Sequence, residues 1–460
     1  MAFPSSHQPV CPPCAWRRLP TKELVIKSTA SLRRSILNRK STVSVIGQGY
    51  VGLSLACAAA EAGFDVIGID IDEPRIADLS KGIMSVPGVP EPIFTSGTTT
   101  GRMSFTTDLD AMIDTEVIIV CVPTPLRDYA PDLSYVEAAC MAVAGRLVPG
   151  QLVVLESTTY PGTTEQLVRP ILESKGLSVG RDFLLAYSPE RIDPGNTEYD
   201  FRSIPRVVGG MTPESTGVSS LFYGQLTDKV FVVSSCRAAE LAKLLENTFR
   251  HVNIALVNEL AMLCHEQEID VWEVIAAAGS KPFGFMPFYP GPGVGGHCIP
   301  LDPSYLSWQV RRDVGHQFRI LEQAQDVNVQ MPVWVASRIG EILNDSGKSV
   351  KNANILVLGV SYKADVGDIR ESPATKVMTS LHKRGAKVTF HDPFVESVGM
   401  NGGVLGRSEL TQRAVSSADC VALLTPHSLY DLDWIAEHAH MVFDARNAFA
   451  EDNRPNVVRL

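Results

Sequence analysis

The feature that most constrains the fold is a glycine-rich turn that lies between a short strand and a helix. Ser41-Thr-Val-Ser-Val-Ile46 is a β-branched run that enters Gly47-Gln-Gly-Tyr-Val-Gly52, and the segment after it is alanine-rich and helical. A second strand, Phe64-Asp-Val-Ile-Gly-Ile69, then ends at Asp70. This order of strand, glycine turn, helix, strand and acid is typical of a dinucleotide-binding βαβ unit and predicts a parallel α/β sheet.

The same segment predicts the cofactor. Gly47, Gly49 and Gly52 permit the tight turn and let a pyrophosphate approach the helix N-terminus, where backbone N–H groups favour an anion. Asp70 is placed to accept hydrogen bonds from a ribose diol, which favours NAD, although Arg75 leaves NADP open. A nucleotide-free αβ unit is the alternative. The residues assigned to the cofactor here are Gly47, Gly49, Tyr50, Val51, Gly52, Asp70 and Arg75.

Three further strands are expected to end in polar loops. Residues 116–122, 151–156 and 183–187 are apolar runs, typical of strands that are buried on both faces. Taken alone, the residues of each loop are typical of an ordinary structural turn, which is the alternative to a binding site. Ligands of open α/β sheets bind at the carboxyl ends of strands, so we expect the three loops in one cleft. Their candidate residues are Pro123, Thr124 and Thr158 for the cofactor, and Glu190 and Arg191 for the substrate.

A long helix is predicted next. Over residues 237–265 apolar residues recur at three- and four-residue spacing. Lys243 and Asn247 lie one turn apart in this helix and therefore project from one face. A solvated lysine is the alternative for Lys243, but its apolar neighbours favour a buried role.

A glycine- and proline-rich stretch follows at residues 291–303. Four glycines and three prolines in this stretch predict a rigid, tightly turned loop and exclude a helix or strand interior. The loop presents one thiol, Cys298, with the carboxylate of Asp302 four residues on. An inert cysteine in a structural turn is the alternative.

The rest of the chain predicts two flanking regions. Residues 1–40 are rich in Pro, Ser and basic residues and are expected to be a disordered extension. The strand pattern restarts near Lys348, which predicts a second doubly wound domain. Its loops carry cations for an anionic ligand, with Arg446 assigned to the cofactor and Lys363 and Arg370 to the substrate. The expected division of the chain is 41–236 for the cofactor domain, 237–345 for a helical dimerisation region, and 346–460 for the second sheet domain.

Composition limits the partners and the compartment. The net charge of −10 argues against nucleic acid. The nine cysteines have no regular spacing, which predicts reduced thiols. No apolar run reaches the roughly 18 residues needed to span a bilayer. We therefore expect a cytoplasmic protein with no nucleic-acid partner, no membrane contact and no metal site.

Seven motifs together resemble those of the nucleotide-sugar 6-dehydrogenases, the family that includes the UDP-glucose, UDP-N-acetylhexosamine and GDP-mannose enzymes. They are G-Q-G-Y-V-G, V-P-T-P, E-S-T-T-Y-P-G, S-P-E-R-I-D-P-G-N, L-E-N-T-F-R, G-V-G-G-H-C-I-P-L-D-P and S-Y-K-A-D-V-G-D-I-R-E-S-P. The resemblance covers Val43 to Arg446 and is greatest for the UDP-N-acetylhexosamine branch. Val294 and His297 stand where the UDP-glucose branch usually has phenylalanine and serine, so UDP-glucose ranks second.

The resemblance implies an activity, in which NAD takes four electrons from the C6 alcohol of a UDP-sugar in polysaccharide biosynthesis. Cys298 would form a thiohemiacetal and then a thioester. A homodimer is expected, because long helices between two sheet domains commonly pack against a second copy. The alternatives are a catalytically lapsed NAD- or sugar-nucleotide-binding protein, and a two-electron dehydrogenase that releases aldehyde. The implied catalytic residues are Cys298, Lys243, Asn247, Asp302, Glu190 and Thr158, and the implied substrate residues are Glu190, Arg191, Lys243, Asn247, Gly295, Lys363 and Arg370.

Overall fold

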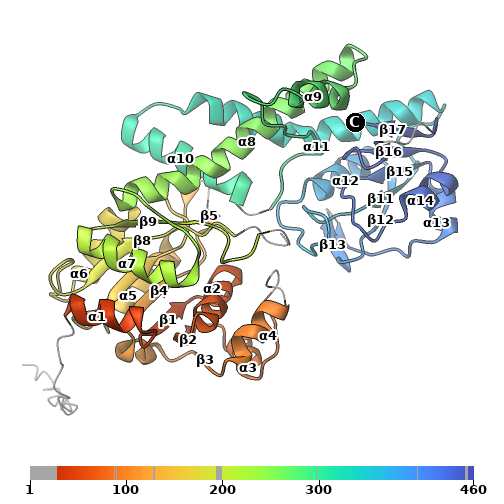
Figure 1. The fold of residues 1–460 in the computed structure, drawn as a ribbon. Coiled ribbons are helices and arrows are strands. Elements are labelled where there is room, and N and C mark those ends of the chain that lie inside the picture. The colour runs from red at the N-terminus through yellow and green to blue at the C-terminus, as the bar shows by residue number, and fades with distance from the viewer. Residues whose placement is uncertain are drawn as a thin grey trace, which may run out of the picture.

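Two α/β lobes are joined by long helices in the computed structural model of the chain (Figure 1). The structure describes residues 28–460 except 87, 88, 90, 128, 129, 193–198, 297, 401 and 451–453, and for Cys298 it describes the backbone alone. The first lobe runs from the N-terminus in red to yellow-green, and the second lobe is blue.

The first lobe is built on an eight-stranded sheet. Six neighbouring strands, from β8 to β3, run parallel through the region that carries the cofactor motif. β9 and β10 run parallel to each other, and only β8 and β9 pair antiparallel. The strand order reverses between β1 and β4, which is the topological switch point where ligands of such sheets bind. In spatial order the strands are β10 (Val230–Val232), β9 (Arg206–Gly210), β8 (Leu184–Tyr187), β7 (Leu152–Leu155), β4 (Val117–Val120), β1 (Thr42–Ile46), β2 (Asp65–Ile69) and β3 (Met103–Thr106).

Helices cover both faces of this sheet, because its strands are apolar on both sides. One face packs against α1, α2 and α7, and the other against α5, α6 and the start of α8. The bounds of the remaining elements of this lobe are α1 (Thr29–Leu37), α2 (Tyr50–Glu61), α3 (Glu73–Ser80), α4 (Glu91–Thr99), η1 (Leu109–Asp114), β5 (Leu126–Arg127), β6 (Ala130–Pro131), α5 (Ser134–Ala144), η2 (Thr164–Val168), α6 (Arg169–Glu173) and α7 (Pro213–Leu226).

The N-terminal prediction is wrong for residues 29–37. They form the helix α1, which Ser28 caps and which buries Leu32 and Ile36 against α7. The sequence pattern of this helix is weak, because its buried face consists of only two apolar side chains four residues apart, with basic residues around them. Residues 1–27 of the expected extension lie outside the described residues.

The central helices are α8 (Cys236–Glu266), α9 (Val271–Gly279), α10 (Cys298–Val314) and α11 (Arg319–Asp345). The long helix predicted for residues 237–265 is confirmed as α8. The stretch 291–303 is only partly the predicted loop, because residues 298–303 form the first turns of α10. Pro300 fits there because the first four N–H groups of a helix have no partner within the helix, so its missing donor costs nothing.

The second lobe is a smaller parallel sheet with the order β12 (Lys387–His391), β11 (Asn354–Leu358), β15 (Cys420–Leu423), β16 (Val442–Asp444) and β17 (Val457–Arg459). Its faces pack against α11 with α12 and against α13 with α14. The sequence-based prediction ended the sheet at residues 441–446, but β17 adds an edge strand beyond β16. The other elements are α12 (Pro373–Lys383), β13 (Ser397–Met400), β14 (Gly403–Gly406), α13 (Gln412–Ser417) and α14 (Leu432–His438). A doubly wound fold in both lobes is thereby confirmed.

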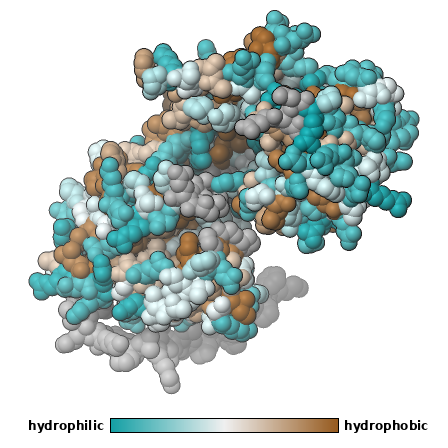
Figure 2. All heavy atoms as spheres, turned by 45° about the vertical axis from the view of Figure 1, so that its right-hand side comes forward, coloured by the Kyte–Doolittle hydropathy of each residue, from teal (hydrophilic) through white to brown (hydrophobic). Residues whose placement is uncertain are grey.

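The surface of both lobes is mostly hydrophilic on the face shown in Figure 2, with brown apolar patches between the teal regions. Among the residues that the structure describes, none of the helices combines the length and the apolar character that a membrane span requires.

Candidate active site

One face of α8 carries the first two candidate residues. Lys243 and Asn247 lie one turn apart, and their exposed fractions are only 7% and 0%. Ser235 caps the helix by accepting the N–H of Ala238, which fixes where α8 begins and therefore which face turns inward. Both side chains are buried, so the solvated-lysine alternative is wrong for Lys243.

Asn247 connects α8 to α10. Its amide nitrogen donates to the Asp302 carboxylate, and its carbonyl oxygen accepts from Arg250. Burial raises the pKa of Asp302 from its ordinary value to about 6, against the charge of Lys243 and the hydrogen bond from Asn247, which lower it. Three of the residues singled out in the sequence therefore meet at one point: Lys243, Asn247 and Asp302.

The cysteine is positioned by the helix that it starts. Cys298 is the first residue of α10 and lies one turn before Asp302, although its side chain and all of His297 are outside the described part of the chain. The Tyr305 hydroxyl donates to the Thr124 carbonyl oxygen. The Gln309 amide donates to the Pro161 carbonyl oxygen at 2.6 Å. The middle of α10 is thus held against the loops that follow β4 and β7.

These two loops carry the next candidates. Thr124 is buried and Pro123 is exposed in the loop after β4. Thr158 is half-buried in the loop after β7, and nearby the Tyr160 ring packs on Trp308 of α10 with their ring centres 5.1 Å apart. The structure therefore brings both loops to α10, as expected for one cleft.

Glu190 and Arg191 follow β8. Glu190 is buried, and one of its oxygens accepts the N–H groups of Arg191 and Ile192. The Arg191 guanidinium pairs with Glu246 of α8 at 2.7 Å, next in sequence to Asn247. The turn after β8 is therefore docked beside the face of α8 that carries the other candidates.

The glycine turn has the shape that a dinucleotide requires. Gly47 has a φ of +93°, and a Cβ there would lie 2.5 Å from the Cys121 carbonyl oxygen. A Cβ on Gly52 would lie 1.8 Å from the Gly47 carbonyl oxygen, so both positions need glycine. A Cβ on Gly49 would meet nothing within 4 Å, which leaves open space in front of the helix. This helix, α2, runs from Tyr50 through Val51 onward, and no side chain caps its N-terminus, which is the end of a helix that favours a pyrophosphate.

Asp70 closes the cofactor region. Its carboxylate accepts the Gln48 N–H at 2.6 Å and the Asp72 N–H at 3.0 Å. Arg75 pairs with the same carboxylate at 2.9 Å. The residues present fit a dinucleotide, with Arg75 held by Asp70 and Asp72 on the side where a ribose would lie.

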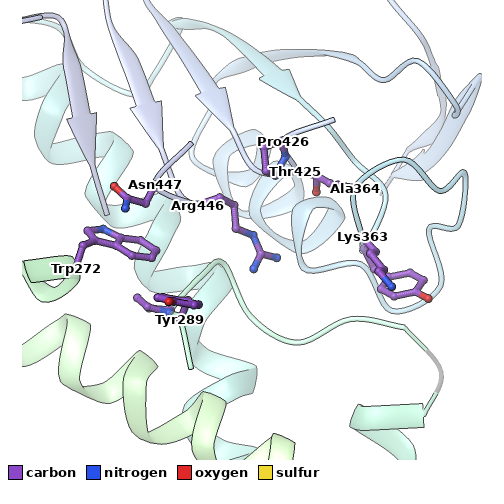
Figure 3. Close-up of a pocket in the computed structure, with 10 residues that line it drawn as sticks. Trp272, Tyr289, Lys363, Ala364, Thr425, Pro426, Arg446 and Asn447 are labelled. Atoms are coloured by element: carbon purple, nitrogen blue, oxygen red, sulfur yellow. The ribbon is translucent and has the colours of Figure 1, made fainter. Parts of the chain in front are cut away.

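A cavity of about 520 Å³ lies between the second lobe and the central helices (Figure 3). The rings of Trp272 and Tyr289 stack at one end, with centres 6.2 Å apart and an angle of 21° between their planes. The Arg446 guanidinium points into the middle and Lys363 lies at the far side. Burial lowers the pKa of Arg446 to about 10, so a bound anion would favour its charged form. A flat aromatic end with cations beyond it fits a nucleoside diphosphate.

The cavity also bears on the prediction for Arg446. The sequence-based prediction gave Arg446 to the cofactor, but the structure lines the second-lobe cavity with it, beside Lys363. Arg370 is exposed and pairs with Asp368, and its carbonyl oxygen accepts the Gly296 N–H at 3.0 Å. Trp272, Tyr289 and Asn447 were missed, because aromatic and amide side chains in a helix, a loop and a strand end carry no shared spacing.

The glycine-rich loop joins the cavity to α10. A Cβ on Gly291 would lie 2.5 Å from the Arg446 guanidinium, and a Cβ on Gly295 would lie 2.7 Å from Tyr362. The Gly291 N–H donates to the side chain of Asn258 on α8 at 3.0 Å. The glycines are therefore required for close packing between the loop and the second lobe.

Within the described part of the chain, no group of three or more His, Cys, Asp and Glu side chains is arranged to hold a metal ion.

Three family models match successive parts of the chain. They describe the UDP-glucose/GDP-mannose dehydrogenase family: its NAD binding domain at residues 41–227, its central domain at 237–330 and its UDP binding domain at 356–451.

Known proteins match over most of their length. A UDP-N-acetyl-D-mannosamine dehydrogenase of Pyrococcus horikoshii is 33% identical over 416 residues, which are 89% of this chain and 96% of that protein. A UDP-N-acetyl-D-glucosamine 6-dehydrogenase of Pseudomonas aeruginosa is 37% identical over 358 residues, or 77% and 83% of the two chains. The solved structure of a Pyrococcus horikoshii UDP-D-ManNAc dehydrogenase has a TM-score of 0.82 and 32% identity, covering 91% of this chain and 98% of that one. The chain therefore belongs to the UDP-glucose/GDP-mannose dehydrogenase family and is an NAD-dependent nucleotide-sugar oxidoreductase.

Proposed function

We propose that the protein oxidises the C6 alcohol of a UDP-N-acetylhexosamine to the carboxylate in two NAD-dependent steps, with Cys298 as the nucleophile. The observation that carries this proposal is the contact between Asn247 and Asp302. It holds the Lys243 face of α8 against the first turns of α10, the helix that starts at Cys298.

Different observations support the nucleotide part and the sugar part of the substrate. The stacked rings of Trp272 and Tyr289 suit a uracil ring, and Arg446 and Lys363 suit the diphosphate. The relatives named for UDP-N-acetyl-D-mannosamine and UDP-N-acetyl-D-glucosamine support the N-acetylhexosamine. UDP-glucose is the second candidate.

NAD bound at the glycine turn would supply the hydride acceptor for each step. Lys243 and Asn247 donate hydrogen bonds to the C6 oxygen as it becomes negative, first on the way to the aldehyde. The Cys298 thiolate then adds to the aldehyde carbon. The new C–S bond regenerates a negative oxygen, which lets the second hydride leave and gives a thioester.

Water then completes the reaction. It adds to the thioester carbon, the C–S bond breaks, and the thiolate of Cys298 leaves. Glu190, which its turn fixes beside α8, takes the proton from that water. Asp302 exchanges protons with Lys243 and the substrate oxygen, since burial raises the pKa of its carboxyl to about 6. Thr158 positions the reacting groups from the loop after β7.

The test counts NADH formed per substrate consumed, with UDP-N-acetylglucosamine, UDP-N-acetylmannosamine and UDP-glucose run in parallel. Two NADH per N-acetylhexosamine, lost in Cys298→Ala, is the expected result. One NADH with free aldehyde would contradict the thioester route. Binding of NAD without any turnover would favour a lapsed enzyme.

We also propose a homodimer that forms through α8. A stripe of exposed apolar side chains runs along this helix, each between 44% and 61% exposed: Leu241, Leu245, Phe249, Leu256 and Leu263. Exposure of such an apolar stripe to water is unfavourable, and packing against the same stripe of a second copy of the chain would bury it. Leu245→Asp should give a monomer in sedimentation, whereas an unchanged mass would contradict the assignment. The division of the chain at residues 236 and 345 remains part of the proposal.

A further inference from the structure

A buried charge cluster surrounds Glu190, and its other members have no part in the steps above. We define the Arg206 cluster as Arg206 on β9, Glu156 directly after β7, Tyr223 on α7, and Glu190 itself. Arg206 is 1% exposed, and Glu156 and Tyr223 are fully buried. Four side chains from four elements therefore meet inside the first lobe.

One cation in this cluster faces two carboxylates. Arg206 donates from Nη2 to Glu190 Oε2 at 3.1 Å, and its Nη1 lies 3.6 Å from Glu156 Oε2. Its guanidinium carbon also lies 4.3 Å from the centre of the Phe201 ring, so it has little room to turn away. The Tyr223 hydroxyl donates to the other oxygen of Glu156, Oε1, and the Tyr223 ring centre lies 6.0 Å from the Arg206 guanidinium carbon.

The charges of the cluster and its burial have opposing effects on the pKa values of Glu156 and Arg206. Burial raises the pKa of Glu156 to about 7, with Glu190 raising it further and Arg206 lowering it. Burial alone would lower the pKa of Arg206, but Glu190 and Glu156 raise it above its ordinary value, so the guanidinium stays charged.

One thiol and two phenols around Glu156 stay neutral at pH 7. Burial raises the pKa of the Tyr223 phenol, and the charge of Glu156 adds to this. Burial likewise raises the pKa of the Cys121 thiol, whose sulfur lies 4.0 Å from Glu156, and the pKa of the Tyr187 phenol on β8. Unlike this thiol and these phenols, the Glu156 carboxyl has a pKa near neutral pH.

Glu190 links this cluster to the reaction. One oxygen of its carboxylate accepts two backbone N–H groups of its own turn, and the other accepts from Arg206. The attraction between Arg206 and this second oxygen depends on the charge of Glu156, because Arg206 faces both carboxylates. When Glu156 is ionised, it competes for Arg206, and Glu190 becomes a better proton acceptor.

We propose that Arg206, Glu156 and Tyr223 are positioning residues that set how readily Glu190 takes a proton from water during hydrolysis of the Cys298 thioester. The inference rests on the proposed function. In this step the water oxygen bonds to the thioester carbon, one water proton goes to Glu190, and the C–S bond breaks with its electron pair going to Cys298. The product leaves as the acid, which then ionises.

The geometry predicts shifts of opposite sign for two variants. Glu156→Gln leaves Arg206 to pair with Glu190 alone, so hydrolysis begins at a pH about one unit lower and its plateau rate falls about 3-fold. Tyr223→Phe weakens the charged form of Glu156 and shifts the profile in the same direction by less. Arg206→Lys cannot reach both carboxylates, so hydrolysis begins about one pH unit higher and acylated Cys298 accumulates.

The experiment measures hydrolysis directly. Enzyme, NAD and UDP-N-acetylhexosamine are mixed, quenched at intervals from pH 6 to 9, and the acylated protein is quantified by mass spectrometry. Glu190→Gln is the reference for blocked hydrolysis. Glu116→Gln is the matched control, because this buried carboxylate accepts the Thr42 N–H at 2.8 Å at the opposite, amino edge of the same sheet. It should leave the profile where it is.

The outcomes separate the two claims. Opposite shifts in Glu156→Gln and Arg206→Lys, with two NADH still formed in the first turnover, support the inference. Shifts in the same direction, or none while Glu190→Gln accumulates thioester, overturn it and leave the proposed function intact. If Arg206→Lys does not fold, the graded shifts of Glu156→Gln and Tyr223→Phe decide. Wild-type enzyme that never forms an acylated cysteine refutes the proposed function itself.

Discussion

Replacing Asp302 by asparagine should make the protein more stable above pH 6 while it damages the reaction. Burial raises the pKa of this carboxyl from its ordinary value of 3.8 to about 6. The folded state therefore favours the neutral form, and the stability that this form contributes is fully present below pH 3.8 and is lost as the pH rises through about 6. At about 1.4 kcal/mol per pH unit, the loss is about 3 kcal/mol above pH 6.

Asparagine imitates the neutral acid at every pH. Its oxygen still accepts the hydrogen bond that Asn247 donates to Asp302 in the wild type. The free energy of unfolding of Asp302→Asn should thus equal that of the wild type near pH 3 and exceed it by about 3 kcal/mol at pH 7.5. Urea unfolding followed by circular dichroism at several pH values measures this difference.

A matched control and a clear refutation are available. Asp326→Asn neutralises an exposed carboxylate on α11 and should leave the unfolding midpoint nearly unchanged across the same range. A stabilisation by Asp302→Asn that does not vary with pH, or a loss of stability at pH 7.5, would show that burial between α8 and α10 does not disfavour the ionised carboxylate.

Three further predictions concern single residues. Lys243→Met should lower kcat by about 10²–10³ with a folded protein by circular dichroism, because one oxyanion donor is lost; an unchanged kcat would exclude Lys243 from that role. Gly47→Ala should lower the free energy of unfolding by at least about 1–2 kcal/mol, because the backbone at this residue is left-handed. The clash of the new Cβ with Cys121 should add to this loss. Gly49→Ala should fold normally and weaken only NAD binding, measured by calorimetry. Arg446→Met should weaken UDP binding about 10- to 100-fold and leave NAD binding unchanged, and equal losses for both ligands would contradict its place in the cavity.

The parts of the fold that depend on local pattern were predictable from the sequence. The turn at Gly47 and the strands before and after it follow from steric rules that act within about 30 residues. The i, i+4 spacing of Lys243 and Asn247 was enough to place both on one buried face of α8. Local chemistry also misled, because the glycines and prolines around Cys298 hid the first turns of α10.

The parts that depend on long-range packing were not predictable. Arg206 meets Glu156 across 50 residues and Glu190 across 16, and nothing in either spacing marks them as partners. The place of Arg446 in the second-lobe cavity was not predictable either, because a strand-end arginine fits any anion until the neighbouring segments are known. The Trp272–Tyr289 stack likewise appears only when α9 and the glycine-rich loop are brought together.

The glycine-rich loop also fixes a length. Pro290 lines the cavity, Gly291 packs on Arg446, Gly296 donates to the carbonyl oxygen of Arg370, and two residues later α10 begins at Cys298. Contacts to the second lobe at both ends fix the length of this span. On the proposed function, that length sets the distance from the bound nucleotide to Cys298. Inserting or deleting one residue in the span should therefore lower turnover of every UDP-sugar alike.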